Sequence, residues 1–266
     1  MSRPPFLSPS QWGTWEHCPR KWRHRYIDGL PDPGSIHTVA GKAAHLMLEL
    51  FMAHEPGDRT PDLREVCLEV ALEEHAEEME RLAVDPDTVR RWVTESHVGF
   101  PATEPAAPSR ARVLHTERRH TMEVNGVPVL LVLDRVDRVE DRKGAQALPI
   151  DYKSGAKIRV ETKERRQMIL SAIAAEEITG LPATPRAQLR FVRMGEVREV
   201  LTGAHARATV AEDILRTWRQ ITAACLEDDF EARPGALCNW CPYATNDICP
   251  QGAREARRYR ERKGIA

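Results

Sequence analysis

The stretch that most constrains the fold is a short apolar run at residues 148–150, followed by Asp151-Tyr152-Lys153 and a Ser-Gly pair at 154–155. This pattern predicts a β-strand that ends at a turn. Side chains two residues apart on a strand share a face, so Asp151 and Lys153 are expected to lie side by side. Such a pair suits metal-dependent hydrolysis, in which the acid holds a divalent cation and the lysine positions or deprotonates the attacking water. A surface ion pair gives the same pattern.

A second strand pattern lies upstream and adds another acid. The Asn-Gly dipeptide at 125–126, which is typical of tight hairpin turns, precedes an apolar run at 127–133. This run is expected to end at Asp134, so two strands each deliver an acid at an end. Asp134 and Asp137 are three residues apart and face opposite sides of a regular strand, so at most one of them joins Asp151 unless a bulge intervenes. We choose Asp134.

The order of these features resembles the RecB-type branch of the PD-(D/E)XK nuclease superfamily. The resemblance rests on the hairpin, on Asp-Arg-x-Asp at 134–137 and on Asp-Tyr-Lys-Ser-Gly at 151–155. It implies a restriction-endonuclease-like α/β core in which Asp134, Asp151 and Lys153 form the catalytic centre. It also implies Mg²⁺ or Mn²⁺ as the catalytic metal.

Three further site residues are carried by the same resemblance. His45 stands in a Gly-x-x-x-His pattern that begins at Gly41 and resembles the histidine motif of this branch, so its imidazole is expected to ligate the metal or contact the substrate. The backbone carbonyl of Tyr152 is an expected metal ligand. Gln167 matches half of a helical Gln-x-x-x-Tyr motif that contacts DNA, because Ser171 replaces the tyrosine. A packed histidine and a solvated glutamine are the alternatives.

Two other patterns have narrower consequences. Glu117, on a strand expected at 113–124, resembles the glutamate that often precedes the Asp-Arg-x-Asp element, and it is either an accessory acid or one half of a cross-strand ion pair. Gly41-Lys42 suggests a phosphate-binding loop, but the glycine required five positions earlier is Ile36. We therefore discard ATP binding.

Four of the six cysteines have the spacing of a metal or cluster site. Cys238 and Cys241 are separated by two residues, Cys249 follows, and Cys18 is the obvious fourth ligand. Thiolate chemistry alone leaves zinc and iron-sulfur open. The resemblance favours a 4Fe-4S cluster, because one amino-terminal and three carboxyl-terminal cysteines form the AddB-like arrangement of cluster-bearing RecB-type nucleases. Such a cluster would staple the two chain ends together.

Hydrophobic periodicity and turn residues predict the remaining elements. Ser8 and Pro9 begin a helix that runs to Tyr26, and its basic face is either solvated or a phosphate contact. The other expected elements are a Pro/Gly loop at 31–40, a helix at 41–53, two or three helices within 61–97, a linker at 101–108, a helix at 160–179, a hairpin at 187–202 and a helix at 206–226.

The chain of 266 residues, 41% of them hydrophobic, can bury one sizeable core with appendages. We expect an α/β fold in which a mixed twisted sheet is flanked by helices, with a helical insertion and an iron-sulfur subdomain formed by both chain ends. The expected regions are an N-terminal helix at 1–30 that contributes to this subdomain, a helical region with the histidine motif at 31–110, the nuclease core at 111–226, and the cysteine cluster with a basic tail at 227–266.

The apolar runs and the charged residues of the sequence bear on where the protein is located and on whether it binds nucleic acid. No apolar run approaches ~18 residues and the start lacks a signal-peptide core, so a cytoplasmic protein without a membrane segment is expected. The net charge of −1 does not decide nucleic-acid binding, because the distribution of charge matters more than its sum. Residues 254–263 hold six basic and two acidic side chains and are either a solvated tail or a phosphate-binding surface.

The resemblance implies a metal-dependent DNA exonuclease that hydrolyses phosphodiester bonds, on single-stranded DNA or DNA ends, in repair, recombination or processing. A helicase or a recombination protein is a candidate partner. The alternative is a non-catalytic iron-sulfur or zinc module that binds nucleic acid or protein.

Overall fold

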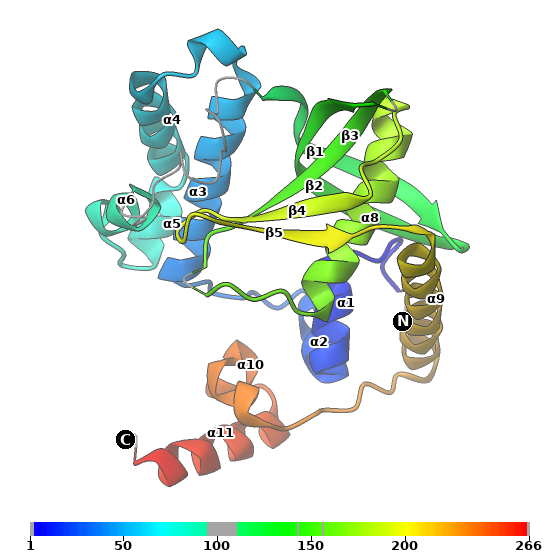
Figure 1. Ribbon diagram of the computed structural model, residues 1–266. Coiled ribbons are helices and arrows are strands. Elements are labelled where there is room, and N and C mark those ends of the chain that lie inside the picture. The colour runs from blue at the N-terminus through cyan, green and yellow to red at the C-terminus, as the bar shows by residue number, and fades with distance from the viewer. Residues whose placement is uncertain (1–2, 95–110, 143, 156, 265–266) are drawn as a thin grey trace. The chain divides into compact units, whose positions relative to one another are not determined.

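The computed structural model describes residues 3–94, 111–142, 144–155 and 157–264, and the linker expected at 101–108 lies outside them (Figure 1). Five strands form one sheet in the order β1-β2-β3-β4-β5. The strands are β1 (Arg112–Val124), β2 (Val127–Asp141), β3 (Gly144–Lys153), β4 (Arg186–Phe191) and β5 (Glu196–Leu201).

The sheet is mixed, as predicted. Strands β2 and β3 are antiparallel, as are β4 and β5, whereas β3 and β4 are parallel. A parallel pair requires a crossover, which is supplied by helix α8 (Thr162–Thr179). Helix α8 ends at Gly180, whose φ of +67° is the left-handed conformation that glycine adopts readily. The expected hairpin turn is also present, with φ of +52° at Asn125 and +76° at Gly126.

The chain divides into two compact units, which are described separately. One unit, here called the sheet unit, consists of Gly34–Met122 and Leu131–Val210. The other, here called the terminal unit, consists of Met1–Pro33, Glu123–Leu130 and Ala211–Ala266.

Helices cover both faces of β3 and β4 in the sheet unit. On one face, a helical cluster packs against Ile150 and Tyr152 of β3. It comprises α3 (Ile36–Ala53), α4 (Pro61–Glu74), α5 (Ala76–Arg81) and α6 (Pro86–Thr94), and the short helix η1 (Pro56–Asp58) connects α3 to α4. On the other face, Met168 of α8 packs against Leu189 and Phe191 of β4. Leu189 pairs with Asp151 and Phe191 with Lys153, so this second face is the one that carries the acid and the lysine.

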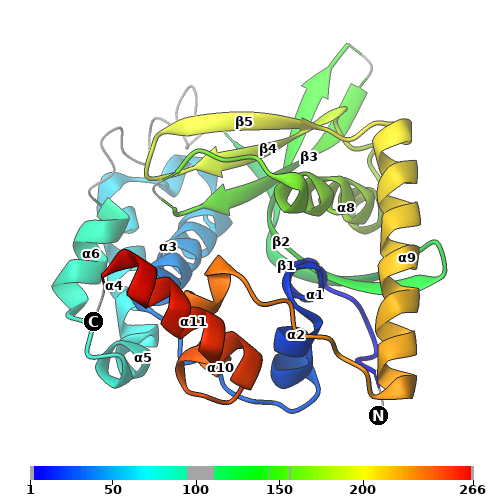
Figure 2. The same ribbon diagram turned by 90° about the horizontal axis from the view of Figure 1, so that it is seen from below.

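The terminal unit is built around three aromatic rings from both ends of the chain. Trp22 is fully buried, and its ring centroid lies 5.5 Å from that of Trp15 and 6.0 Å from that of Phe230. Helix α9 (Ala204–Glu227) begins in the sheet unit and continues into the terminal unit from Ala211. It is followed by η3 (Ala236–Trp240), α10 (Pro242–Thr245) and α11 (Pro250–Lys263), and Figure 2 shows α10 and α11 as successive helices joined by a short connection. The basic tail is therefore largely helical.

The single helix expected at 9–26 is wrong, because the structure has two helices there, α1 (Pro9–His17) and α2 (Pro19–Tyr26). They are separated at Cys18, whose φ of −163° and ψ of 110° are extended. A proline disfavours the helical conformation in the residue before it, so Pro19 breaks the helix at this cysteine. The predicted cap at Ser8 is present, since its hydroxyl accepts a hydrogen bond from the backbone N–H of Gln11 at 3.2 Å.

Two other boundaries also differ from expectation. Helix α3 begins at Ile36, capped by the hydroxyl of Ser35, so the loop expected at 31–40 is shorter than predicted. Strand β2 does not end at Asp134 but continues to Asp141, because its ladder with β3 extends to the pair between Asp141 and Gly144. Asp134 therefore lies in the middle of a strand.

The described helices include none whose length and apolar character would let it cross a lipid bilayer. The predicted division into regions at 1–30, 31–110, 111–226 and 227–266 stays a prediction.

Candidate active site

Neighbouring strands place the two predicted acids beside each other. The ladder pairs Arg135 of β2 with Ile150 of β3, and one further step along these antiparallel strands brings Asp134 opposite Asp151. Both acids line a pocket of about 470 Å³. The backbone N–H of Tyr152 donates a hydrogen bond to Asp134 Oδ2 at 2.7 Å, which fixes this carboxylate against β3.

Lys153 and Gln167 close a cluster around Asp151. Lys153 Nζ lies 2.8 Å from Asp151 Oδ2, as the two-residue spacing predicts. Gln167, on α8, donates to Asp151 Oδ1 at 2.6 Å and accepts from Lys153 Nζ at 3.3 Å. The glutamine thus contacts both partners of the ion pair and holds them in one geometry.

His45 and Glu117 approach Asp134 from the other side. His45 Nδ1 lies 3.4 Å from Asp134 Oδ2 and 3.7 Å from Glu117 Oε1. Among the residues that the structure describes, these three form a group whose ligand atoms all lie within 4.8 Å of one another, close enough to hold a metal ion. Asp151 is not part of this group. Glu117, which was expected to be an accessory acid or one half of a cross-strand ion pair, therefore lies closer to Asp134 and His45 than that expectation required.

Glu117 reaches this position through an unusual backbone conformation. Its φ is +41°, within a strand whose other residues are extended, and such values are costly for residues other than glycine. The local distortion lets β1 direct a carboxylate toward His45. Sequence pattern alone indicates the strand but cannot indicate this distortion.

A close backbone approach explains the glycine of the Gly-x-x-x-His pattern. A Cβ atom on Gly41 would lie 3.1 Å from Ser154 Oγ, which is tighter than an ordinary contact. Helix α3 can therefore run close to the turn after Lys153. His45 is one helical turn beyond Gly41, so the same approach brings its imidazole to the acids.

The donor set fits a divalent cation. Asp151 Oδ2 is buried and has the Lys153 ammonium as its counter-charge at 2.8 Å. Asp134 and Glu117 add two further carboxylates, and clustered carboxylates are costly unless a cation compensates for them. Carboxylate and carbonyl oxygens are the ligands preferred by Mg²⁺ and Mn²⁺, and Asp134, Asp151 and Tyr152 could supply them, with the imidazole of His45 beside them.

The pKa values of Asp134, His45 and Lys153 are all raised, and the carboxylates gathered at the site contribute to each of these changes. Burial raises the pKa of Asp134 to about 7, and the charge of Asp151 adds to this effect. Burial by itself lowers the pKa of His45, but Glu117, Asp134 and Asp151 outweigh it and raise that pKa to about 9. The pKa of Lys153 is also raised, because the attraction of Asp151 outweighs burial. The site therefore holds protons that a metal ion would displace.

The pocket also has a basic rim that the sequence reasoning missed. Lys157, Arg159 and Lys163 line it together with the site residues. The sequence feature that could have predicted this rim is the high proportion of lysine and arginine directly after Gly155. Cationic side chains at the rim can neutralise phosphates of a bound nucleic acid.

The four predicted cluster cysteines all belong to the terminal unit. Burial raises the pKa of the Cys238 thiol, and Cys241, Cys18 and Cys249 add to this effect. A Cβ atom on Gly252 would lie 3.3 Å from Cys249 Sγ and 3.6 Å from Cys238 Sγ. The nearest atom would be Ala244 Cβ at 2.9 Å, so glycine permits close packing against Ala244 as well as against the two sulfurs.

A family model described as the PD-(D/E)XK nuclease superfamily matches residues 6–250. The chain therefore belongs to the PD-(D/E)XK nuclease superfamily, whose membership indicates a metal-dependent nuclease. A search of curated proteins found no match. The RecB-type branch, the iron-sulfur cluster and the roles of individual residues stay predictions at this point.

Stability without metal is expected to fall as the pH rises. Both His45 and Asp134 bind their protons more tightly in the folded chain than their ordinary pKa values of 6.5 and 3.8 allow. Their contribution to stability is complete below these ordinary values and is lost as the pH rises through about 7 for Asp134 and about 9 for His45. Thermal unfolding in EDTA, measured at a series of pH values, should show a decreasing Tm.

Added Mn²⁺ should remove most of this decrease, because the ion replaces the departing protons. The Asp134→Asn variant is the control, since it cannot titrate and should show a flatter Tm profile in EDTA. A metal-free Tm that rises across this interval would contradict the assignment of these pKa values.

Proposed function

We propose that the chain is a Mg²⁺- or Mn²⁺-dependent DNA exonuclease of the RecB-type branch. It would hydrolyse phosphodiester bonds of single-stranded DNA or of DNA ends, in repair, recombination or related processing, beside a helicase or recombination protein. The observation that supports this most strongly is the meeting of Asp134, Asp151 and Lys153 at one pocket with a basic rim.

The proposed roles follow from the contacts. Asp134 and Asp151 hold the cation, assisted by His45 and by the Tyr152 carbonyl. The cation, when bound, supplies a Lewis acid that polarises the phosphoryl oxygen. Lys153 lies next to Asp151, so its ammonium can orient the attacking water and offset the negative charge that develops on the phosphoryl oxygens.

Gln167 is assigned to the catalytic set because of its two hydrogen bonds. Its amide nitrogen contacts Asp151 and its amide oxygen contacts Lys153, so it determines the separation of acid and amine. Its neighbour in the half-motif, Ser171, donates instead to the backbone carbonyl of Gln167 and leaves the tyrosine position of the motif without an aromatic ring.

We also propose a 4Fe-4S cluster held by Cys18, Cys238, Cys241 and Cys249. The presence of all four cysteines in the terminal unit and the close approach of Gly252 to Cys249 Sγ and Cys238 Sγ support it. The cluster would crosslink the amino- and carboxyl-terminal segments, which already share the aromatic core of the terminal unit. Crosslinking positions this far apart in sequence restricts the unfolded chain strongly, so the expected contribution is stability.

Removal of the acid or the amine should abolish cleavage while the fold persists. We expect Asp151→Asn and Lys153→Met each to lower cleavage of labelled single-stranded DNA by at least ~100-fold, because each removes charge stabilisation at the reacting phosphate. Substrates labelled at the 5′ or the 3′ end, single- and double-stranded, would report the mode of digestion in the same assay. Circular dichroism would confirm folding.

Asp229→Asn is the matched control, because Asp229 is an exposed aspartate outside the pocket. It should cleave at the wild-type rate. Undiminished cleavage by Asp151→Asn would remove the catalytic assignment. A wild-type protein that binds single-stranded DNA but cuts none at any Mg²⁺ or Mn²⁺ concentration would favour the non-catalytic binding module.

Anaerobic purification should yield a coloured protein with about four iron atoms per chain. Cys18→Ala should lose the visible absorbance and lower the Tm, because Cys18 is the sole amino-terminal ligand in the proposed set. Cys67→Ala is the control, since Cys67 is a buried cysteine of the sheet unit and is outside the proposed set, and it should retain the iron. A colourless protein with about one zinc ion per chain would contradict the cluster.

A further inference from the structure

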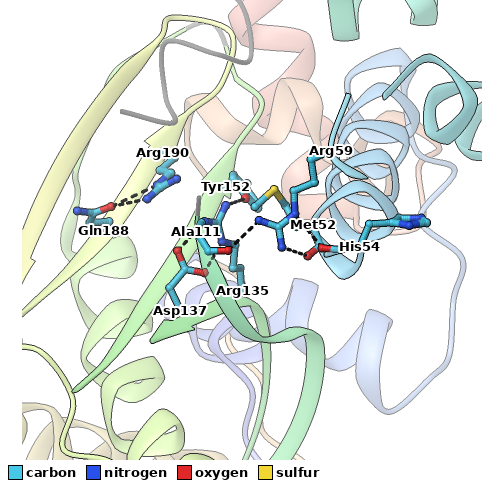
Figure 3. A network of polar contacts seen from close by, with 9 residues as sticks. All are labelled: Met52, His54, Arg59, Ala111, Arg135, Asp137, Tyr152, Gln188 and Arg190. Atoms are coloured by element: carbon cyan, nitrogen blue, oxygen red, sulfur yellow. Dashed lines mark hydrogen bonds and ion pairs between the residues drawn. The ribbon is translucent and has the colours of Figure 1, made fainter. Parts of the chain in front are cut away.

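The strands that carry the proposed catalytic residues hold a second polar cluster on their opposite face (Figure 3). Arg135 is fully buried, and it donates to Asp137 Oδ1 at 2.6 Å and to Asp137 Oδ2 at 2.5 Å. A third nitrogen of the same guanidinium donates to the hydroxyl of Tyr152 at 2.8 Å. We call Arg135, Asp137 and Tyr152 the back-face cluster.

The back-face cluster alternates in sequence with the site. On β2, Asp134 faces the pocket while Arg135 and Asp137 share the other side, as the spacing of two requires. On β3, Tyr152 lies between Asp151 and Lys153, whose side chains meet at the pocket. Each shift of a back-face residue along its strand would therefore move a neighbour in the site.

Tyr152 connects the two faces directly. Its hydroxyl accepts from Arg135, and its ring meets the imidazole of His45 edge to face, with centroids 6.3 Å apart and planes at 85°. Its backbone N–H holds Asp134 Oδ2 at 2.7 Å. Tyr152 thus contacts Arg135 at its hydroxyl and the proposed metal ligands Asp134 and His45 at its backbone and ring. Fixing the hydroxyl therefore helps to fix the positions of Asp134 and His45.

Burial makes a purely stabilising role a poor explanation of this cluster. Arg135 has no exposed surface and Asp137 is 4% exposed, so both charges lose their hydration on folding. The desolvation penalty of such a pair commonly equals or exceeds its Coulomb gain, and an apolar replacement is often no less stable. A fixed bidentate geometry is what a buried arginine and a carboxylate supply and what apolar side chains cannot.

We infer that Arg135, Asp137 and the Tyr152 hydroxyl are positioning residues that hold Asp134 and His45 in the geometry required for binding the catalytic cation. This inference rests on the proposed function, since it needs a cation at Asp134. Arg135, Asp137 and the Tyr152 hydroxyl would act through the Tyr152 ring and backbone, and of Tyr152 only the backbone carbonyl is a proposed metal ligand.

The direct test is Tyr152→Phe, which removes one hydroxyl and keeps the ring against His45. Partners behind metal ligands typically alter metal affinity by 10- to 100-fold, so we expect the Kd for Mn²⁺, measured by calorimetry, to rise about 10-fold. Cleavage of labelled single-stranded DNA should fall to the same extent at limiting Mn²⁺ and should recover in excess Mn²⁺. Recovery by metal is a readout that loss of stability alone does not give.

Arg135→Met tests the cluster more severely, and Arg59→Met is its matched control. Arg59 is also buried in the sheet unit, but it donates to the backbone carbonyls of Met52, His54 and Ala111 (Figure 3). Both variants should have a lower Tm. Only Arg135→Met should weaken Mn²⁺ binding, whereas Arg59→Met should retain the wild-type Kd.

The outcomes separate the two proposals. If wild-type protein binds Mn²⁺ and cuts DNA while Tyr152→Phe shows the same Kd and the same metal dependence, the positioning role is wrong and the proposed function stands. If Arg59→Met weakens Mn²⁺ binding as much as Arg135→Met, the effect is one of general stability and the inference is also overturned. If wild-type protein neither binds Mn²⁺ nor cuts DNA, the proposed function fails first and the inference fails with it.

Discussion

The repulsion between two carboxylates on adjacent strands is the constraint on which this site depends. Asp134 and Asp151 line one pocket, and burial together with the charge of Asp151 raises the pKa of Asp134 to about 7. The two acids have different neighbours: Lys153 and Gln167 contact Asp151, whereas His45 lies next to Asp134. Such an arrangement is costly when empty and becomes favourable when a divalent cation is shared by both acids.

The alternation of side chains along a strand directs the residues of each motif to two opposite faces of the sheet. In Asp-Arg-x-Asp, the first acid faces the pocket, and Arg135 and Asp137 pair on the buried opposite face. In Asp-Tyr-Lys, the outer residues meet at the pocket, and Tyr152 is directed to the other side. Each motif therefore places some residues at the pocket and others on the opposite face, because the side-chain period of a strand is two.

The parts of the fold that follow from local rules were predictable from the sequence. The Asn125-Gly126 turn and the adjacency of Asp151 and Lys153 need only strand geometry, and both appear in the structure. Hydrophobic periodicity predicts one continuous helix from Pro9 to Tyr26, but Pro19 disfavours the helical conformation at Cys18 and divides it in two. The place of Glu117 beside His45 could not be predicted, since it depends on a strained φ and on packing between distant segments, and neither leaves a local signal in the sequence.

The measurement that tests the central claim most directly is anomalous X-ray diffraction from crystals grown with Mn²⁺. The account predicts a strong anomalous peak within coordination distance of a carboxylate oxygen of Asp134 and one of Asp151, with the imidazole of His45 adjacent. A fully occupied Mn²⁺ site elsewhere, with these two carboxylates turned apart and no peak between them, would contradict it.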